Sequence, residues 1–152
     1  MQSDDKRPKI YFAVSITGGR ELAETYDKIG SILNSKGIVL TEHMTKNSIT
    51  SNGENLSASF IHDRDLKWID ESDVVVAEVT NTSLGVGYEL GYVFGRHTGR
   101  SNKPVLALYN TGAARNKLSG MIRGSPSVES HEYSTIEEAK VIIDEFFKRK
   151  LK

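Results

Sequence analysis

The chain has 152 residues, of which 38% are hydrophobic, which is enough for one domain with a core of its own. Lysine plus arginine and aspartate plus glutamate both number 20, so no field of one sign would draw the whole protein to nucleic acid or to an anionic membrane. The absence of cysteine excludes a disulfide scaffold, a thiol nucleophile and a cysteine-based zinc site.

No apolar run approaches the length of a membrane span, and residues 1–8 lack the apolar core of a signal peptide. The lack of cysteine also fits a reducing compartment. We therefore expect a cytoplasmic protein, with the nucleus as a further compartment, that binds neither membrane nor nucleic acid.

The predicted elements alternate between strands and helices after a polar segment at 1–8, which we expect to be disordered. In chain order they are a strand at 9–15, a helix at 21–36, a strand at 38–42, a helix from Ser57 or Ser59 to 71, a strand at 73–79, a helix from about Gly87, a strand at 104–109, a short helix or turn at 118–123, a weaker strand at 128–133 and a helix from Ser134 or Thr135 to 150. The polar stretch at 44–56 is expected to be a long loop, and such loops often bind ligands.

This alternation predicts a single α/β domain at 9–152, a flavodoxin-like or Rossmann-like three-layer sandwich with a five-stranded, mostly parallel sheet. The predicted strand order is 2-1-3-4-5. In such sheets, ligands bind beyond the carboxyl ends of the strands, at the switch between strands one and three. Polar and glycine-rich loops follow strands one, two and three of this chain, so we expect the functional site there.

The stretch from Thr80 to Gly91, T-N-T-S-L-G-V-G-Y-E-L-G, follows the most apolar run of the chain. A strand, a glycine-bearing turn and a helix start form a place for an anion, because the first amides of a helix have no internal partner. Glu89 falls in the first turn of a helix that begins near Gly87, where the helix dipole favours a charged carboxylate that can act as a nucleophile or base. The glycines fit close backbone approach to a ligand and plain turns equally well, and their spacing differs from the dinucleotide motif G-x-G-x-x-G.

The other candidates are weak when each is taken alone. S-I-T-G-G-R at 15–20 lacks the Lys-Ser/Thr ending of a P-loop, so it is interpreted as an ordinary strand-to-helix turn. Asp65, beside Arg64, is interpreted as a solvated carboxylate, and Tyr11 in mid-strand as a core residue. Together, Asp65 and Glu89 could divide the roles of acid and nucleophile, provided that the fold brings them near one another.

Two histidines and the basic C-terminus have simple interpretations. His43 and His62 lack a second histidine or a cysteine at ligand spacing, so we expect them to be hydrogen-bonding or surface residues rather than metal ligands. The basic residues at 148–150 complement the end of the last helix, which is a better interpretation than RNA binding or targeting.

Five blocks of the sequence together carry a family resemblance. They are K-I-Y-F-A-V-S-I-T-G-G-R, V-L-T-E-H, I-H-D-R-D-L-K-W, D-V-V-V-A-E-V-T-N-T-S-L-G-V-G-Y-E-L-G and L-S-G-M-I-R-G. In this order they resemble the nucleoside 2-deoxyribosyltransferase superfamily and, within it, the 2'-deoxynucleoside 5'-phosphate N-hydrolases. The likeness covers residues 9–147, and the block that ends S-L-G-V-G-Y-E-L-G is its most specific part.

The resemblance implies cleavage of the N-glycosidic bond of a 2'-deoxynucleoside 5'-monophosphate to a free base and 2-deoxyribose 5-phosphate. It implies that Glu89 is the nucleophile that forms a glycosyl-enzyme intermediate, that Asp65 assists departure of the base, and that Tyr11 orients the nucleophile and contacts the sugar. The substrate-binding residues that it implies are Ser15, Ile16, Thr17, Gly18, Gly19, Arg20, His43, Ser83, Gly85, Ser119 and Met121. In this set His43 lines the nucleobase, and Ser119 reaches the phosphate from the neighbouring subunit of a homodimer with shared active sites. No metal or organic cofactor is implied.

The chain departs at two positions from the vertebrate members that it resembles, which have Gly and Arg where it has Val14 and Thr17. Val14 could narrow the space near the sugar or base, and Thr17 removes a cation near the expected phosphate, which Arg20 could replace. A charge-assisted hydrogen bond contributes about 1.5–3 kcal/mol, so phosphate preference is less firmly predicted than glycosidic cleavage. Two other functions stay open: a deoxyribosyltransferase that passes the sugar from Glu89 to a second base, and a nucleotide-binding sensor without turnover.

Overall fold

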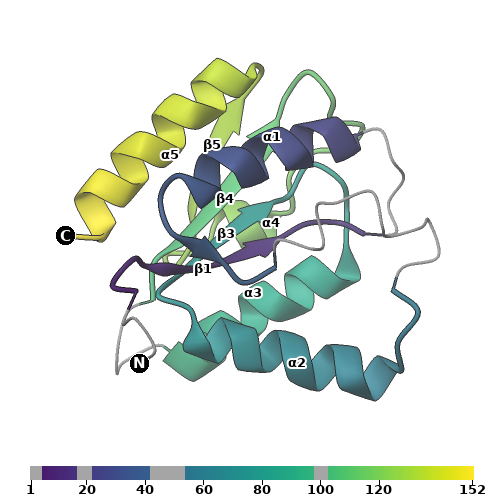
Figure 1. The fold of residues 1–152 in the computed structure, drawn as a ribbon. Coiled ribbons are helices and arrows are strands. Elements are labelled where there is room, and N and C mark those ends of the chain that lie inside the picture. The colour runs from purple at the N-terminus through teal and green to yellow at the C-terminus, as the bar shows by residue number, and fades with distance from the viewer. Residues whose placement is uncertain (1–4, 17–21, 42–53, 98–102) are drawn as a thin grey trace.

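The computed structural model describes residues 5–16, 22–41, 54–97 and 103–152, and its centre is one parallel five-stranded sheet (Figure 1). The strands are β1 (Lys9–Ala13), β2 (Ile38–Val39), β3 (Val74–Glu78), β4 (Val105–Asn110) and β5 (Glu129–Tyr133). The helices are α1 (Ala23–Asn34), α2 (Ala58–Glu71), α3 (Leu84–His97), α4 (Gly120–Arg123) and α5 (Ile136–Lys150). The strand order β2-β1-β3-β4-β5 confirms the predicted topology.

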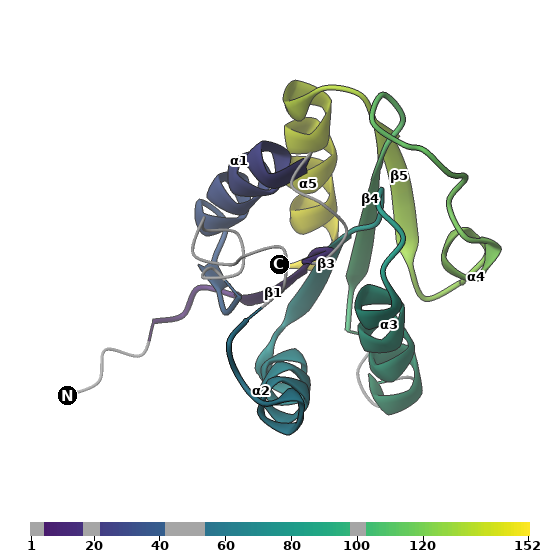
Figure 2. The ribbon, with the colours of Figure 1, turned by 90° about the vertical axis from the view of Figure 1, so that its right-hand side faces the viewer.

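The sheet separates two hydrophobic cores, because successive side chains of a strand point to opposite faces. Helices α1 and α5 cover one face, and α2 and α3 cover the other (Figure 2). Phe12 and Val76 belong to the core under α1 and α5, whereas Tyr11 and Val75 belong to the core under α2 and α3. All five residues of β3 are buried, which explains why this strand is valine-rich rather than alternating.

The second strand is shorter than predicted, since β2 ends at Val39 and the expected strand continued to residue 42. The next step of the ladder is still present, because the amide of Leu40 donates to the carbonyl of Ile10 at 2.9 Å. The hydroxyl of Thr41 then accepts from the amide of Phe12 at 3.0 Å and donates to the carbonyl of Phe12 at 2.8 Å. A side chain thus takes the place of the backbone ladder at this edge of β1.

The start of α3 also differs from the prediction, by three residues. The helix begins at Leu84 instead of near Gly87. The Ser83 side chain accepts from the amide of Val86 at 3.2 Å, and the Ser83 carbonyl accepts from the amide of Gly87 at 3.1 Å. Glu89 therefore lies in the second turn, and the interpretation of Gly87 as a plain turn residue is wrong because this glycine is helical.

The other helix ends follow the local signals of the sequence. Ser57 caps α2 through its side chain, and Thr135 caps α5 in a capping box with Glu138. Gly37 follows α1 where the chain passes close to the N-terminal segment, and a Cβ at this position would lie 2.2 Å from the carbonyl oxygen of Pro8. Of the segment 1–8, residues 1–4 lie outside the described part, and Pro8 accepts a hydrogen bond from the amide of Ile38 at 2.8 Å. None of the helices in the described ranges has both the length and the hydropathy needed to cross a membrane.

A fully buried carboxyl group, that of Glu78, ends β3 on the side covered by α1 and α5. Its Oε1 accepts hydrogen bonds from Thr80 and, at 3.2 Å, from the hydroxyl of Tyr133. The Thr80 hydroxyl in turn accepts from the amide of Asn110 at 2.8 Å, which connects β3 to β4. Burial raises the pKa of Glu78 to about 7, although the hydrogen bonds from Thr80 and Tyr133 act in the opposite direction.

We expect Glu78→Gln to gain stability over the wild type as the pH rises. The ordinary pKa of a glutamate side chain is 4.5, so between pH 4.5 and pH 7 the unfolded chain loses a proton that the folded chain keeps, and the wild type is progressively destabilised. The free energy of unfolding of the variant minus that of the wild type should rise by on the order of 3 kcal/mol across this window and be flat on either side. Urea unfolding at a series of pH values measures it, and a difference that does not change with pH would contradict it.

Candidate active site

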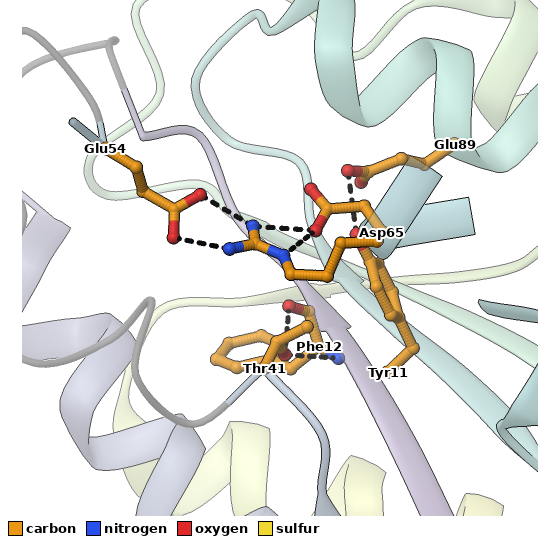
Figure 3. A network of polar contacts seen from close by, with 7 residues as sticks. Tyr11, Phe12, Thr41, Glu54, Asp65 and Glu89 are labelled. Atoms are coloured by element: carbon orange, nitrogen blue, oxygen red, sulfur yellow. Dashed lines mark hydrogen bonds and ion pairs between the residues drawn. The ribbon is translucent and has the colours of Figure 1, made fainter. Parts of the chain in front are cut away.

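Tyr11 lies in the middle of β1 and points toward the helices α2 and α3. Its side chain is fully buried, as predicted for a core residue, but its hydroxyl also has a polar partner. The Tyr11 hydroxyl donates to Oε1 of Glu89 at 2.9 Å, across the core between β1 and α3 (Figure 3). The pKa of Tyr11 is raised well above its usual range, first by burial and then by the charges of Glu89 and Asp65. Tyr11 is therefore a neutral hydrogen-bond donor to the carboxylate.

Glu89 is a half-buried carboxyl group whose proton is held more tightly than usual. Burial raises the pKa of Glu89 to about 7, the negative charge of Asp65 raises it as well, and the hydrogen bond from Tyr11 lowers it. The expectation of a carboxylate kept charged by the helix dipole is wrong, because Glu89 lies beyond the first turn of α3 and desolvation dominates. A carboxyl group with this pKa is partly ionised at neutral pH, which suits a nucleophile or a base.

Asp65 is buried on α2, with 7% of its surface exposed, so the interpretation as a solvated carboxylate is wrong. Arg64 holds it: the guanidinium donates from Nε to Oδ1 of Asp65 at 2.9 Å. The same guanidinium binds both carboxylate oxygens of Glu54, at 2.9 and 2.6 Å. The fold thus brings Tyr11, Asp65 and Glu89 into one cluster from three elements, β1, α2 and α3 (Figure 3).

The residues expected around a phosphate follow β1 and β3. Ser15 is buried directly after β1, and Ile16 is a partly buried side chain that packs against the core under α1 and α5. Ser83 and Gly85 lie at the N-terminus of α3, where the Ser83 hydroxyl caps the helix. The expected sites at 17–20 and at His43 lie outside the described residues.

Ser119 and Met121 line a pocket of about 550 Å³ between the start of α3 and the segment around α4. Ser83, Gly87 and Tyr88 line the same pocket from α3. Among the described residues around it, the Tyr11, Asp65 and Glu89 cluster is not part of the lining. The side chain of Met121 is 83% exposed. Ser119 is therefore near the predicted phosphate end of α3 and does not line the carboxylate cluster of its own chain.

The structure also shows where Val14 and His62 lie. Val14 is 5% exposed and packs in the core under α1 and α5, on the face of the sheet opposite Tyr11, and its effect on the space near the sugar or base stays a prediction. His62 is an exposed hydrogen-bonding residue, as predicted, with Nδ1 2.8 Å from Oδ1 of Asp63 and Nε2 3.2 Å from the hydroxyl of Tyr88.

Comparison with known proteins gives the cluster a family context. Residues 10–143 match the family model described as nucleoside 2-deoxyribosyltransferase. The chain belongs to this family. It is 42% identical to a 5-hydroxymethyl-dUMP N-hydrolase of Tetraodon nigroviridis over 91% of this chain and 96% of the relative. It is 41% identical to the 5-hydroxymethyl-dUMP N-hydrolase of Homo sapiens over 93% of this chain and 80% of the relative.

Two solved structures share the fold at low sequence identity. A Clostridium botulinum CMP N-glycosidase matches with a TM-score of 0.63 and 18% identity, covering 91% of this chain and 98% of that chain. A 2-deoxyribosyltransferase from Bacillus psychrosaccharolyticus matches with a TM-score of 0.59 and 19% identity, covering 87% of this chain and 90% of that chain. These matches support the three-layer architecture and the strand order described above.

The sequence reasoning missed Glu54 and assigned Arg64 no role. Glu54 fell inside the predicted loop at 44–56, and its pairing with Arg64 spans ten positions without any periodic signal. A local signal for Arg64 did exist, since Trp68 lies four residues later on the same helix face and the guanidinium carbon lies 4.6 Å from the centroid of the Trp68 ring.

We expect Tyr11→Phe to raise the pKa of Glu89 above about 7, because the hydrogen bond from Tyr11 favours the charged carboxylate. A lost hydrogen bond of this kind corresponds to roughly one pKa unit. NMR titration of the protein labelled with ¹³C at the glutamate carboxyls measures the change, with the Glu89 signal assigned by its absence in Glu89→Gln. An unchanged midpoint in Tyr11→Phe would show that this hydroxyl does not stabilise the charged form.

Proposed function

We propose that this chain hydrolyses the N-glycosidic bond of 2'-deoxynucleoside 5'-monophosphates, releasing the free base and 2-deoxyribose 5-phosphate. The observation that carries the proposal is the buried cluster in which Tyr11 donates to Glu89 beside Asp65. Two carboxyl groups in different environments are what glycosidic cleavage through a covalent intermediate requires. The relatives named as 5-hydroxymethyl-dUMP N-hydrolases support a phosphorylated deoxynucleoside as substrate.

In the first half-reaction, the ionised Glu89 carboxylate attacks C1' of the deoxyribose as the bond from C1' to the base nitrogen breaks. The carbon that develops positive charge is stabilised by this carboxylate, and the hydrogen bond from Tyr11 holds Oε1 in place. The base leaves with the electron pair of the broken bond and takes up a proton from the solvent, and Asp65 assists this departure. The product of the step is an ester between C1' and Glu89.

In the second half-reaction, water attacks C1' of the ester, and the carboxylate of Glu89 leaves. Asp65 accepts the proton of the attacking water and passes it to the solvent, which returns Asp65 to its starting state. The net reaction adds water across the glycosidic bond and regenerates Glu89. The same ester could pass the sugar to a second base, and addition of free base to the assay separates this deoxyribosyltransferase reaction from hydrolysis.

The start of α3 is the proposed site of the 5'-phosphate. The amides of the first helical turn carry partial positive charge, and Ser83 and Gly85 lie at this end. Ser15 approaches from the end of β1. In this proposal one helix has both an anion-binding end, next to Ser83, and a cation-stabilising carboxylate, that of Glu89 six positions later.

The active sites are proposed to be shared within a homodimer. Leu84, Tyr88 and Met121 are 93%, 59% and 83% exposed and line the pocket of about 550 Å³ that also contains Ser119. Gly87 and Gly91 leave open space where a Cβ would stand, although glycine disfavours helix by about 1 kcal/mol relative to alanine. An apolar surface over a glycine-rich helix face fits close approach of a second copy, which would bring its Ser119 to the phosphate end of α3.

We expect the wild type to release free base from deoxynucleoside monophosphates but not from the corresponding nucleosides. The panel should include 5-hydroxymethyl-dUMP, the four common deoxynucleoside monophosphates and the matching ribonucleotides. Glu89→Ala should lower the rate by about 10³-fold or more, because it removes the nucleophile. Chromatographic detection of the base measures the rate. Absence of turnover together with retained nucleotide binding would instead support a sensor.

The shared site predicts that two impaired variants restore activity when mixed. Ser119→Asp keeps a residue that can cap α4 but places a negative charge against the phosphate, and Glu89→Ala lacks the nucleophile. A hybrid dimer has one site with both native side chains, so co-expressed, doubly tagged heterodimers should regain up to about half of the activity of the wild type. Heterodimers that remain as inactive as either parent would show that Ser119 serves the Glu89 of its own chain and would contradict the shared site.

A further inference from the structure

Arg64 is the cation at the centre of the network around Asp65. Its guanidinium donates from Nε to Oδ1 of Asp65 at 2.9 Å, and one of its terminal nitrogens lies 2.8 Å from the same oxygen. On its other side it forms a two-pronged pair with Glu54, at 2.9 and 2.6 Å. Dashed lines in Figure 3 mark these bonds between Glu54, the guanidinium and Asp65.

The network is withdrawn from solvent, unlike an ordinary surface ion pair. The side chains of Arg64, Glu54 and Asp65 are 14%, 8% and 10% exposed. The guanidinium carbon lies 4.6 Å from the ring centroid of Trp68 and 6.0 Å from that of Phe60, so aromatic faces restrict it as well. A planar fork held by two carboxylates and a ring has little freedom to move, and neither has the carboxylate that it binds.

The geometry matters because Asp65 and Glu89 are two acidic groups in one buried site. The charge of Asp65 contributes to the raised pKa of Glu89. A guanidinium bound to Oδ1 compensates the charge of Asp65 and fixes how the carboxylate is presented to the space beside Glu89. The pairs with Glu54 and then with Asp65 raise the pKa of Arg64, so this cation stays charged under all conditions of an assay.

We propose that Arg64 is a positioning residue of the hydrolase. It is anchored by Glu54 and Trp68, and it holds the carboxylate of Asp65 in the orientation that assists departure of the base from the sugar carbon that Glu89 attacks. This inference rests on the proposed function. It adds to the site a residue that supports Asp65 without contacting the substrate. Arg64 acts through Asp65 and not on the substrate. The contribution of Arg64 to kcat should therefore vanish when the carboxylate of Asp65 is removed by substitution.

The test is a double-mutant cycle on the rate of base release. In the wild-type background, Arg64→Gln should lower kcat by about tenfold to a hundredfold, the range expected for a lost charge-assisted hydrogen bond, with KM changed by less than about threefold. In the Asp65→Asn background, the same substitution should lower kcat by less than about twofold. Equal losses in the two backgrounds, or a change confined to KM, would overturn the role through Asp65.

A surface pair supplies the matched control. Arg149→Gln removes an exposed arginine paired with Glu129 and should leave kcat unchanged. Should Arg64→Gln fail to fold by circular dichroism, Arg64→Lys retains the charge and loses the fork, and it should lower kcat about threefold to tenfold only when Asp65 is present. An Arg64→Lys variant with the kcat of the wild type overturns the proposal.

The two proposals fail in distinguishable ways. A wild type that releases no base from any substrate of the panel removes the proposed function itself. A wild type that releases base, with Glu89→Ala inactive and Arg64→Gln at full kcat, keeps the proposed function and removes only the role of Arg64.

Discussion

The hydrogen bond from Tyr11 to Glu89 connects positions 78 residues apart and joins β1 to the glycine-rich helix α3. Because Tyr11 is fully buried, its hydroxyl needs a partner inside the core, and Glu89 is that partner. Because Glu89 is desolvated, its charged form needs a donor, and Tyr11 is that donor. The hydrogen bond thus lowers the free-energy cost of burying each of the two groups. The placement of β1 beside β3, and of α3 over them, is what allows the two groups to meet.

The two ends of the proposed site differ in the sign of their charge. Around the proposed reaction centre, the carboxyl groups of Glu54 and Asp65 bind the guanidinium of Arg64, and Glu89 lies beside Asp65. In the proposed reaction, the carboxylate of Glu89 stabilises a sugar carbon that becomes positive as the base leaves. The N-terminus of α3 has the opposite character, since the partial positive charge at the start of a helix attracts anions. One helix therefore has an acidic second turn, where we propose that the sugar binds, and an electropositive first turn, where we propose that the phosphate binds.

Local signals in the sequence were sufficient for the strand order and for most helix ends. Ser57 and Thr135 are side-chain caps that a short motif reveals, and the valine-rich run of β3 can only be buried on both faces. The failures concern contacts between distant parts of the chain. The end of β2 depends on Thr41 reaching Phe12, and the burial of Asp65 depends on Arg64 finding Glu54. At α3, the cap at Ser83 was local, but the glycines that follow it resemble a turn more than a helix.

The division of the interior by the sheet has an evolutionary consequence. Tyr11 belongs to the layer under α2 and α3, and these two helices carry Asp65 and Glu89, whereas most of the larger aromatic and aliphatic side chains lie in the layer under α1 and α5. Substitutions in the layer under α1 and α5 change the thermal stability of the fold without a direct contact to the groups proposed to react. A lineage that moves to a warmer or colder habitat can therefore change the thermal stability of the protein through substitutions in the layer under α1 and α5. The catalytic groups proposed in the layer under α2 and α3 stay under separate selection.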